Sequence, residues 1–277
     1  MNRFWPALLT ALLCACTALP PVPGGAPVIG IDRAPFKPLD PGSYDQASLH
    51  FMVRTYGADN ARRVSAQAEQ LYRTIMTDTN LYSFMPSGLY EIVVYGTHDE
   101  YVAKTGQPEW TGGVAYGNAI YSYENPRLNE TIAHEMTHLV FNEFMAYGRD
   151  DVLWLNEGLA VYEQNKAAVG KGEPPDIFPG VRDRLRAQPV ALAEMLAFVP
   201  LEQKTADDPN GWRVTLWYAQ AESMVQFLLD RGGRLGFSQL LQSLKDRKSY
   251  DAAFASSYPG LWNGLADFYA GWAKSRA

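Results

Sequence analysis

The chain has 277 residues, of which 47% are hydrophobic, enough for one sizeable folded domain or two small lobes around a cleft. Its 24 lysines and arginines stand against 30 aspartates and glutamates, a net charge of −6, so no basic footprint indicates a nucleic-acid partner. The sequence contains no long run of either charge and no internal repeat. The function must therefore be inferred from particular residues and their spacing.

The N-terminus has the features of an export signal. An apolar run from Ala7 to Leu13 is too short to span a membrane as a helix. The following Leu-Cys-Ala-Cys resembles a bacterial lipobox with Cys16 as the lipidated residue, although a cysteine is unusual at the position of Cys14. We therefore expect residues 1–16 to be a lipoprotein-type signal peptide; the alternative is ordinary cleavage near Ala18. Either signal indicates export into a bacterial cell envelope, and the lipobox predicts a membrane-anchored protein facing the periplasm.

Residues 17–43 are rich in proline and glycine, which predicts a tether ahead of a folded domain over 44–277. That domain contains no cysteine, so its stability must come from packing, helped by any bound metal. Its oligomeric state cannot be inferred from the sequence.

The first half of the domain alternates strands and helices. Asp59 or Asn60 is expected to cap a long helix, and Thr97 or Asp99 a short one. Gly117 and Asn118 are typical hairpin-turn residues between two short strands. In chain order we predict a strand at 48–53, a helix ending at Met76, a strand at 89–95, a helix ending at Lys104, and strands at 110–115 and 119–123.

For the second half of the domain, the sequence predicts helices and no strands. A proline-containing segment over 170–189 is expected to be irregular and could border a cleft. The predicted helices span 129–146, 155–168, 192–198, 214–230, 236–246, 250–256 and 260–274. The layout is α+β, with a small mixed sheet lobe followed by a mainly helical C-terminal lobe.

The chemistry is concentrated in the sequence His134-Glu135-Met136-Thr137-His138. Two histidines four residues apart on a helix lie on one face, where both imidazoles can bind one metal ion. Glu135 lies beside the first ligand, where its carboxylate could act as a general base. This HExxH pattern is typical of zinc metallopeptidases, and the preceding Asn129 is expected to cap the helix.

A third ligand is expected in Trp154-Leu155-Asn156-Glu157-Gly158-Leu159-Ala160. Eighteen residues separate His138 from Glu157, enough for one helix to end and a second to run back. Three protein ligands leave one zinc position open for catalysis. The alternative is a pair of buried helices whose histidines simply pack in the core. That alternative gives no reason why Asn and Glu interrupt an otherwise apolar run.

The HExxH pattern followed after eighteen residues by Glu157 resembles the gluzincin peptidases, particularly the aminopeptidase N family and small peptidase MA-like proteins. The resemblance spans roughly residues 60–275. It implies a zincin-like fold, one Zn²⁺ per chain held by His134, His138 and Glu157, and hydrolysis of peptide or protein substrates by Glu135-assisted attack of zinc-bound water.

The resemblance also suggests where a substrate binds. Gly112, Gly113, Val114 and Ala115 stand where the aminopeptidases carry a Gly-Ala-Met-Glu-Asn segment, on a sheet edge that pairs with substrate backbone. This sequence has no glutamate there to bind a free amino terminus, so a strict aminopeptidase is not expected. Close backbone packing is the alternative role for the two glycines.

Two further residues receive roles from this comparison. Tyr218 lies 61 residues after Glu157, where gluzincins carry a Tyr or His that stabilises the oxyanion. Core packing beside Ala221 and Val225 is its alternative, and Tyr162 is the reserve candidate. Asn156 could orient a ligand or simply cap its helix.

Two other functions remain open. One is a catalytically weak, zinc-bearing envelope protein that binds or assembles partners, although an intact Glu135 favours an enzyme. The other is zinc-dependent hydrolysis of a non-peptide bond, which no sequence feature excludes. Cleavage of a peptide library would separate them.

Overall fold

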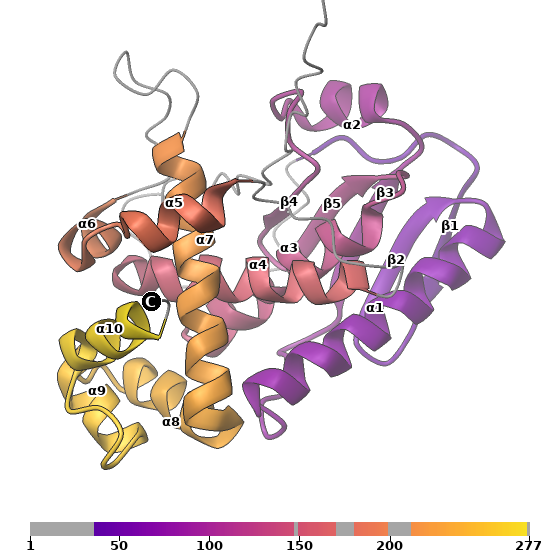
Figure 1. Cartoon of the computed structure of the whole chain (residues 1–277). Helices are drawn as coiled ribbons and strands as arrows, with labels where there is room; N and C mark the ends of the chain where they lie inside the picture. The colour runs from indigo at the N-terminus through magenta and orange to yellow at the C-terminus, as the bar shows by residue number, and fades with distance from the viewer. Residues whose placement is uncertain (1–35, 147–148, 170–179, 199–211, 276–277) are drawn as a thin grey trace, which may run out of the picture.

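The computed structural model describes residues 36–146, 149–169, 180–198 and 212–275. The predicted signal peptide, Cys16 and most of the tether lie outside these residues. Within the described ranges, no helix combines the length and apolar character needed to cross a membrane. The chain forms a five-stranded mixed sheet followed by a mainly helical part, which confirms the predicted α+β class (Figure 1).

The sheet has the strand order β1-β2-β3-β5-β4. Its three central strands are parallel, and the two edge strands, β1 and β4, pair antiparallel to their neighbours. The predicted strand at 89–95 and the hairpin around Gly117 are confirmed. The strands are β1 Ser43–Ala47, β2 Phe51–Tyr56, β3 Tyr90–Tyr95, β4 Gly113–Tyr116 and β5 Ala119–Tyr123.

The single strand predicted at 48–53 is wrong, because a hairpin occupies that region. Ser48 donates its backbone N–H to the Phe51 carbonyl at 2.8 Å, which closes a tight turn between β1 and β2. His50 lies in this turn, and its Nδ1 lies 2.8 Å from Glu69 Oε2.

Helices α1 (Ala58–Thr79) and α3 (Leu128–Phe144) cover one face of the sheet, and α2 (His98–Thr105) covers the other. Phe36 also packs on the second face, with its ring edge-on to Tyr121 at 4.8 Å. Folded contacts thus begin before residue 44, and the predicted tether extends too far.

Helix starts depend on local backbone chemistry that the sequence indicates only in part. Thr97 caps α2 as predicted, accepting the Glu100 N–H at 3.2 Å. Helix α1 is preceded instead by Gly57 at φ 83°, a conformation that glycine adopts readily, so Asp59 and Asn60 lie inside the helix. Asn129 likewise lies inside α3 and does not cap it.

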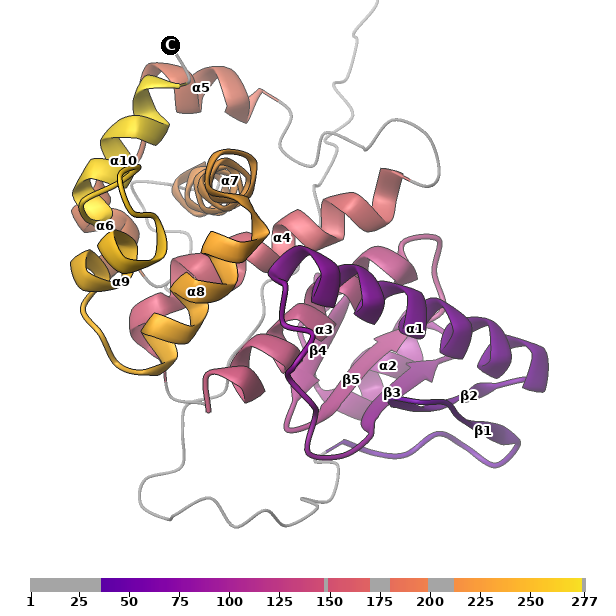
Figure 2. The same ribbon diagram turned by 90° about the horizontal axis from the view of Figure 1, so that it is seen from below.

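The remaining helices build the C-terminal part, with α3 and α4 between the sheet and α7 (Figure 2). The irregular structure predicted for 170–189 is wrong over 181–187, where Val181 and Leu185 form the buried face of α5. Residues 170–179 lie outside the described ranges. The bounds are α4 Leu153–Val169, α5 Val181–Ala187, α6 Leu192–Ala197, α7 Trp212–Phe227, α8 Gly233–Lys245, α9 Tyr250–Ser257 and α10 Leu265–Lys274, with single turns η1 Asp150–Val152 and η2 Leu228–Gly232.

Candidate metal centre

Helices α3 and α4 pack against each other and bring the three predicted ligands together. His134, His138 and Glu157 are all buried, with exposed fractions of 1%, 4% and 5%. Their nearest ligand atoms all lie within 4.8 Å of one another. The three side chains that the motif spacing predicted as ligands therefore lie close together in the structure.

The contact distances show which atoms face the common centre. The two imidazole Nε2 atoms are 3.2 Å apart. Glu157 Oε2 lies 3.9 Å from Nε2 of His134 and 3.6 Å from Nε2 of His138. Three electron-pair donors thus surround one small space from two helices.

The electrostatics favour a cation in this space. Burial lowers the pKa of His138 to about 4 and that of His134 well below its usual range, so both imidazoles are neutral and these contacts are not ion pairs. Burial raises the pKa of Glu157 to about 8, and the charge of Glu135 adds to the rise. Glu157 Oε2 is buried and has no hydrogen-bond partner among the described residues. A metal ion would satisfy all three donors, as two nitrogens and one oxygen suit zinc.

Two amides on α4 orient the imidazoles. The Nδ1 atom of His138 lies 2.9 Å from Asn156 Oδ1, and that of His134 lies 2.9 Å from Gln164 Oε1. An amide oxygen can only accept, so each Nδ1 carries the proton and each Nε2 presents its lone pair to the centre. The Asn156 amide in turn donates to Asn142 Oδ1 at 3.1 Å. Asn156 therefore contacts a predicted ligand and is no N-cap, since α4 begins at Leu153.

Gln164 was not predicted from the sequence. It lies seven residues, or about two helical turns, after Glu157, so both side chains lie on one face of α4. That spacing is the signal that could have identified it.

Glu135 is fully buried beside His134. Its negative charge contributes to the raised pKa of Glu157, so the two carboxyl groups interact electrostatically. The predicted general base is thus buried on the same helix as the two histidines.

Gly158 sets the distance between α4 and α7. A Cβ atom at this position would lie 2.4 Å from the Ala221 carbonyl oxygen, so only glycine allows the two helices to approach this closely. Tyr218 lies one turn before Ala221 on α7 and is 2% exposed. The predicted oxyanion donor is thus on the helix that packs directly against the residue after Glu157.

Tyr162, the reserve candidate, faces the opposite side of α4. Its ring lies 5.5 Å from Lys166 Nζ, and the charge of Asp78 helps burial to raise its pKa to about 12. Lys166 and Arg234 both pair with the buried Asp78, which joins α1, α4 and α8 on that side. Tyr162 therefore belongs to this interhelical network, and the structure removes it as a candidate for the metal centre.

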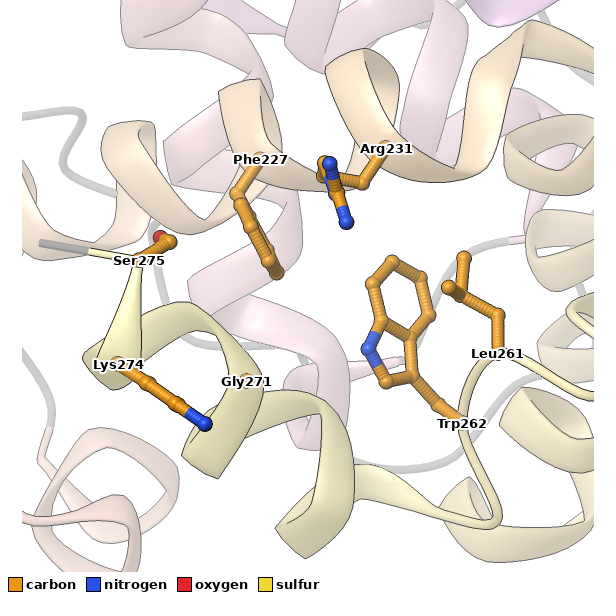
Figure 3. Close-up of a pocket in the computed structure, with 7 residues that line it drawn as sticks. All are labelled: Phe227, Arg231, Leu261, Trp262, Gly271, Lys274 and Ser275. Carbon is orange, nitrogen blue, oxygen red and sulfur yellow. The ribbon is translucent and has the colours of Figure 1, made fainter.

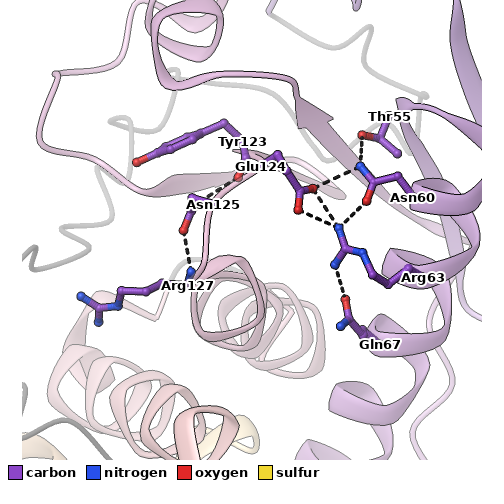
Figure 4. A network of polar contacts seen from close by, with 8 residues as sticks. All are labelled: Thr55, Asn60, Arg63, Gln67, Tyr123, Glu124, Asn125 and Arg127. Atoms are coloured by element: carbon purple, nitrogen blue, oxygen red, sulfur yellow. Dashed lines mark hydrogen bonds and ion pairs between the residues drawn. The ribbon is translucent and has the colours of Figure 1, made fainter. Parts of the chain in front are cut away.

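A polar network fixes the point where α3 begins (Figure 4). Glu124, just after β5, accepts from Arg63 Nη2 at 2.7 Å and from Asn60 Nδ2 at 3.1 Å, both on α1. Asn125 Oδ1 then accepts the Arg127 backbone N–H at 2.8 Å, which shapes the turn just before α3. These contacts tie the start of α3 to α1.

Strand β4 lies alongside α3 at the edge of the sheet. A Cβ atom at Gly113 would lie 2.6 Å from Thr131 Cγ2, so close packing against α3 explains this glycine. Among the described residues β4 pairs only with β5, which leaves its other side as the sheet edge. Gly112, Gly113 and Val114 are buried, and Ala115 is half-buried.

The chain is similar to one known protein family over the region that holds these residues. A family model described as "Peptidase MA superfamily" matches residues 67–275, a span that includes the whole metal centre. The comparison with curated proteins gives no match. Among solved structures, the chain is similar to yeast LTA4 hydrolase in complex with bestatin, at 15% identity and a TM-score of 0.42, over 79% of this chain and 37% of that chain. The chain thus spans little more than a third of that hydrolase. Because the family model covers most of its length, the chain belongs to the Peptidase MA superfamily.

Proposed function

We propose that the protein is a zinc-dependent peptidase in which His134, His138 and Glu157 bind one Zn²⁺. The observation that carries this proposal is the convergence of three buried metal-ligand atoms. Two belong to neutral imidazoles, and the third, Glu157 Oε2, has no hydrogen-bond partner among the described residues. Glu135, a second buried glutamate, lies on the same helix as the histidines. A site that only stabilised the fold would not need a second carboxylate, that of Glu135, whose burial carries a desolvation cost.

The remaining chemistry divides between two side chains. Zinc, when bound, would act as a Lewis acid on the scissile carbonyl and on the attacking water. Glu135 takes the proton of that water and returns it to the leaving amine. The Tyr218 hydroxyl donates a hydrogen bond to the carbonyl oxygen as negative charge develops there. Asn156 and Gln164 hold the two imidazoles in their binding tautomer.

Substrate backbone is proposed to pair with the free side of β4, at Gly112–Ala115, as an added strand. This segment lacks the glutamate with which aminopeptidases bind a free amino terminus. We therefore expect a metal-loaded protein to cleave a peptide library at internal bonds, and acetylated peptides to be cleaved as well as free ones. Mass spectrometry of the products measures both. Release of single N-terminal residues that acetylation abolishes would contradict this specificity, and no cleavage of any peptide would favour the binding-protein alternative.

Gln164→Leu is expected to lower zinc affinity by roughly 10- to 100-fold, because the His134 imidazole loses the acceptor that fixes its orientation. Competition with a chelator of known affinity measures the change. Gln70→Leu, at an exposed position of α1, is the matched control and should bind zinc normally. Equal affinity in the Gln164 and Gln70 variants would show that the amide does not position the ligand.

We also propose that the protein is exported and anchored to a membrane through a lipid on Cys16. Cys16→Ser should abolish labelling by a radioactive or clickable fatty acid and release the protein from the membrane fraction. Cys14→Ser is the matched control, since it keeps the proposed acceptor. Labelling that survives Cys16→Ser and disappears in Cys14→Ser would move the acylation site.

A further inference from the structure

A second pocket lies in the C-terminal helices, and none of its lining residues belongs to the metal centre (Figure 3). Its volume is about 350 Å³, within the range typical of small-molecule sites. Phe227, the last residue of α7, lines the pocket. It lies nine residues after Tyr218, or about 13 Å along the helix axis. The lining consists of Phe227, Arg231, Leu261, Trp262, Gly271, Lys274 and Ser275.

The apolar wall of this pocket is rigid. Trp262 is only 5% exposed, and its ring packs against Tyr258 at 4.8 Å and Phe268 at 5.1 Å. Phe227 lies 5.8 Å from the same indole. A Cβ atom at Gly271 would lie 3.3 Å from Trp262 Nε1, so the absence of a side chain there leaves room at the polar edge of the indole. A flat apolar group would thus meet a preformed aromatic surface.

An unusual turn places a cation over this wall. Arg231 lies in the π-helical turn Leu228–Gly232, a form that is rare and often found at functional sites. The turn is held against Tyr258, because a Cβ atom at Gly232 would lie 2.3 Å from that ring. In Figure 3 the Arg231 guanidinium extends into the space between Phe227 and Trp262.

Three donors of the pocket lack a partner among the described residues, whereas the Ser275 hydroxyl donates to the Trp272 carbonyl at 2.7 Å. Within the described part of the chain, Arg231 and Lys274 form no ion pair, and the indole Nε1 of Trp262 donates no hydrogen bond. Among the described residues the lining includes no carboxylate, although the chain as a whole carries a net charge of −6. Two positive charges and an N–H therefore border an aromatic surface, and no anion within the described ranges pairs with them.

We propose that this pocket binds a small organic anion with a flat apolar body, of the aryl carboxylate class. The carboxylate would lie at the Arg231 guanidinium, which can form charge-assisted hydrogen bonds to it, and the ring would lie on Trp262 and Phe227. Lys274, on the other side of the pocket, would add positive charge at its rim (Figure 3). This binding is independent of the metal centre and of the proposed peptidase activity.

The test is titration of the full chain, labelled with ¹⁵N at tryptophan, with 2-naphthoate. The indole N–H signal of Trp262, assigned by its loss in Trp262→Phe, should shift and saturate. The neutral 2-naphthamide and the bare anion acetate should each bind at least about 5-fold more weakly, because each lacks one half of the recognised group. Arg231→Gln and Lys274→Gln should each weaken naphthoate binding by about 2- to 5-fold, as expected for solvent-accessible charge pairs.

Arg73→Gln is the matched control, an exposed cation on α1. It should bind naphthoate like the unmodified chain. The proposal is overturned if the Trp262 signal does not saturate, if naphthamide binds as tightly as naphthoate, or if the Arg231 and Lys274 variants bind as tightly as the Arg73 control. Peptide hydrolysis is measured separately, so a protein that cleaves no peptide can still pass this test.

Discussion

Glu135→Gln is expected to lower the turnover of an internally cleaved peptide by about 10²- to 10⁴-fold, the range typical of a lost general base. Glutamine has the shape of glutamate but cannot take a proton from water at neutral pH. The side chain is fully buried next to His134, so no solvent group can replace it readily. The three proposed ligands are untouched, and zinc content measured by atomic absorption should stay near one per chain.

The matched control for this variant is Glu91→Gln. Glu91 lies on β3 near Arg54, with about a third of its side chain exposed, and has no contact with the metal centre. Its turnover should equal that of the unmodified protein. Full activity in Glu135→Gln would remove Glu135 as the base, whereas lost zinc would instead indicate that the carboxylate supports the ligands.

The three candidate metal ligands could be predicted because their arrangement depends on short spacings. His134 and His138 are one turn apart on any helix, so their common face follows from the sequence alone. The prediction for Glu157 required only a second helix that runs back beside the first, and the apolar residues around Glu157 indicated that helix. Its convergence with both histidines is confirmed by the structure.

Other features depend on contacts between distant segments and could not be predicted in the same way. The carbonyl of Ala221 approaches Gly158 across 63 residues of sequence, and nothing local to the glycine indicates that approach. Gln164 bonds His134 only because α4 runs back beside α3. Phe36 lies in a proline-rich stretch that resembles a tether, and its packing on Tyr121 is visible only in the folded sheet.

Helix α5 illustrates a different kind of error. The surrounding prolines and glycines predicted irregular structure, yet Val181 and Leu185 are four residues apart and both are 1% exposed. Two apolar residues at helical spacing are too weak a signal to predict a helix among so many prolines and glycines. Packing against α7 then stabilises the short helix, as tertiary contacts commonly do.

Tyr218→Phe tests the second catalytic role. The change keeps the ring, which packs edge-on against Trp217 at 5.3 Å, and deletes only the hydroxyl. Because other enzymes lose about 100-fold or more in turnover when an oxyanion donor is removed, a similar loss is expected here. Zinc content and the thermal unfolding midpoint should change little, since the buried apolar surface is the same.

The chain itself offers a matched control for this variant. Tyr162→Phe also removes a hydroxyl from a tyrosine on a helix beside the metal centre, but that ring faces Lys166 and the Asp78 network. Its turnover should therefore remain within about 2-fold of the unmodified enzyme, because the lost hydroxyl makes no contact in the transition state. If Tyr218→Phe retains normal turnover, the hydroxyl does not stabilise the oxyanion. If it loses activity together with its unfolding cooperativity, the role of Tyr218 is to pack α7 against α4, and the donor must be sought elsewhere on the cleft.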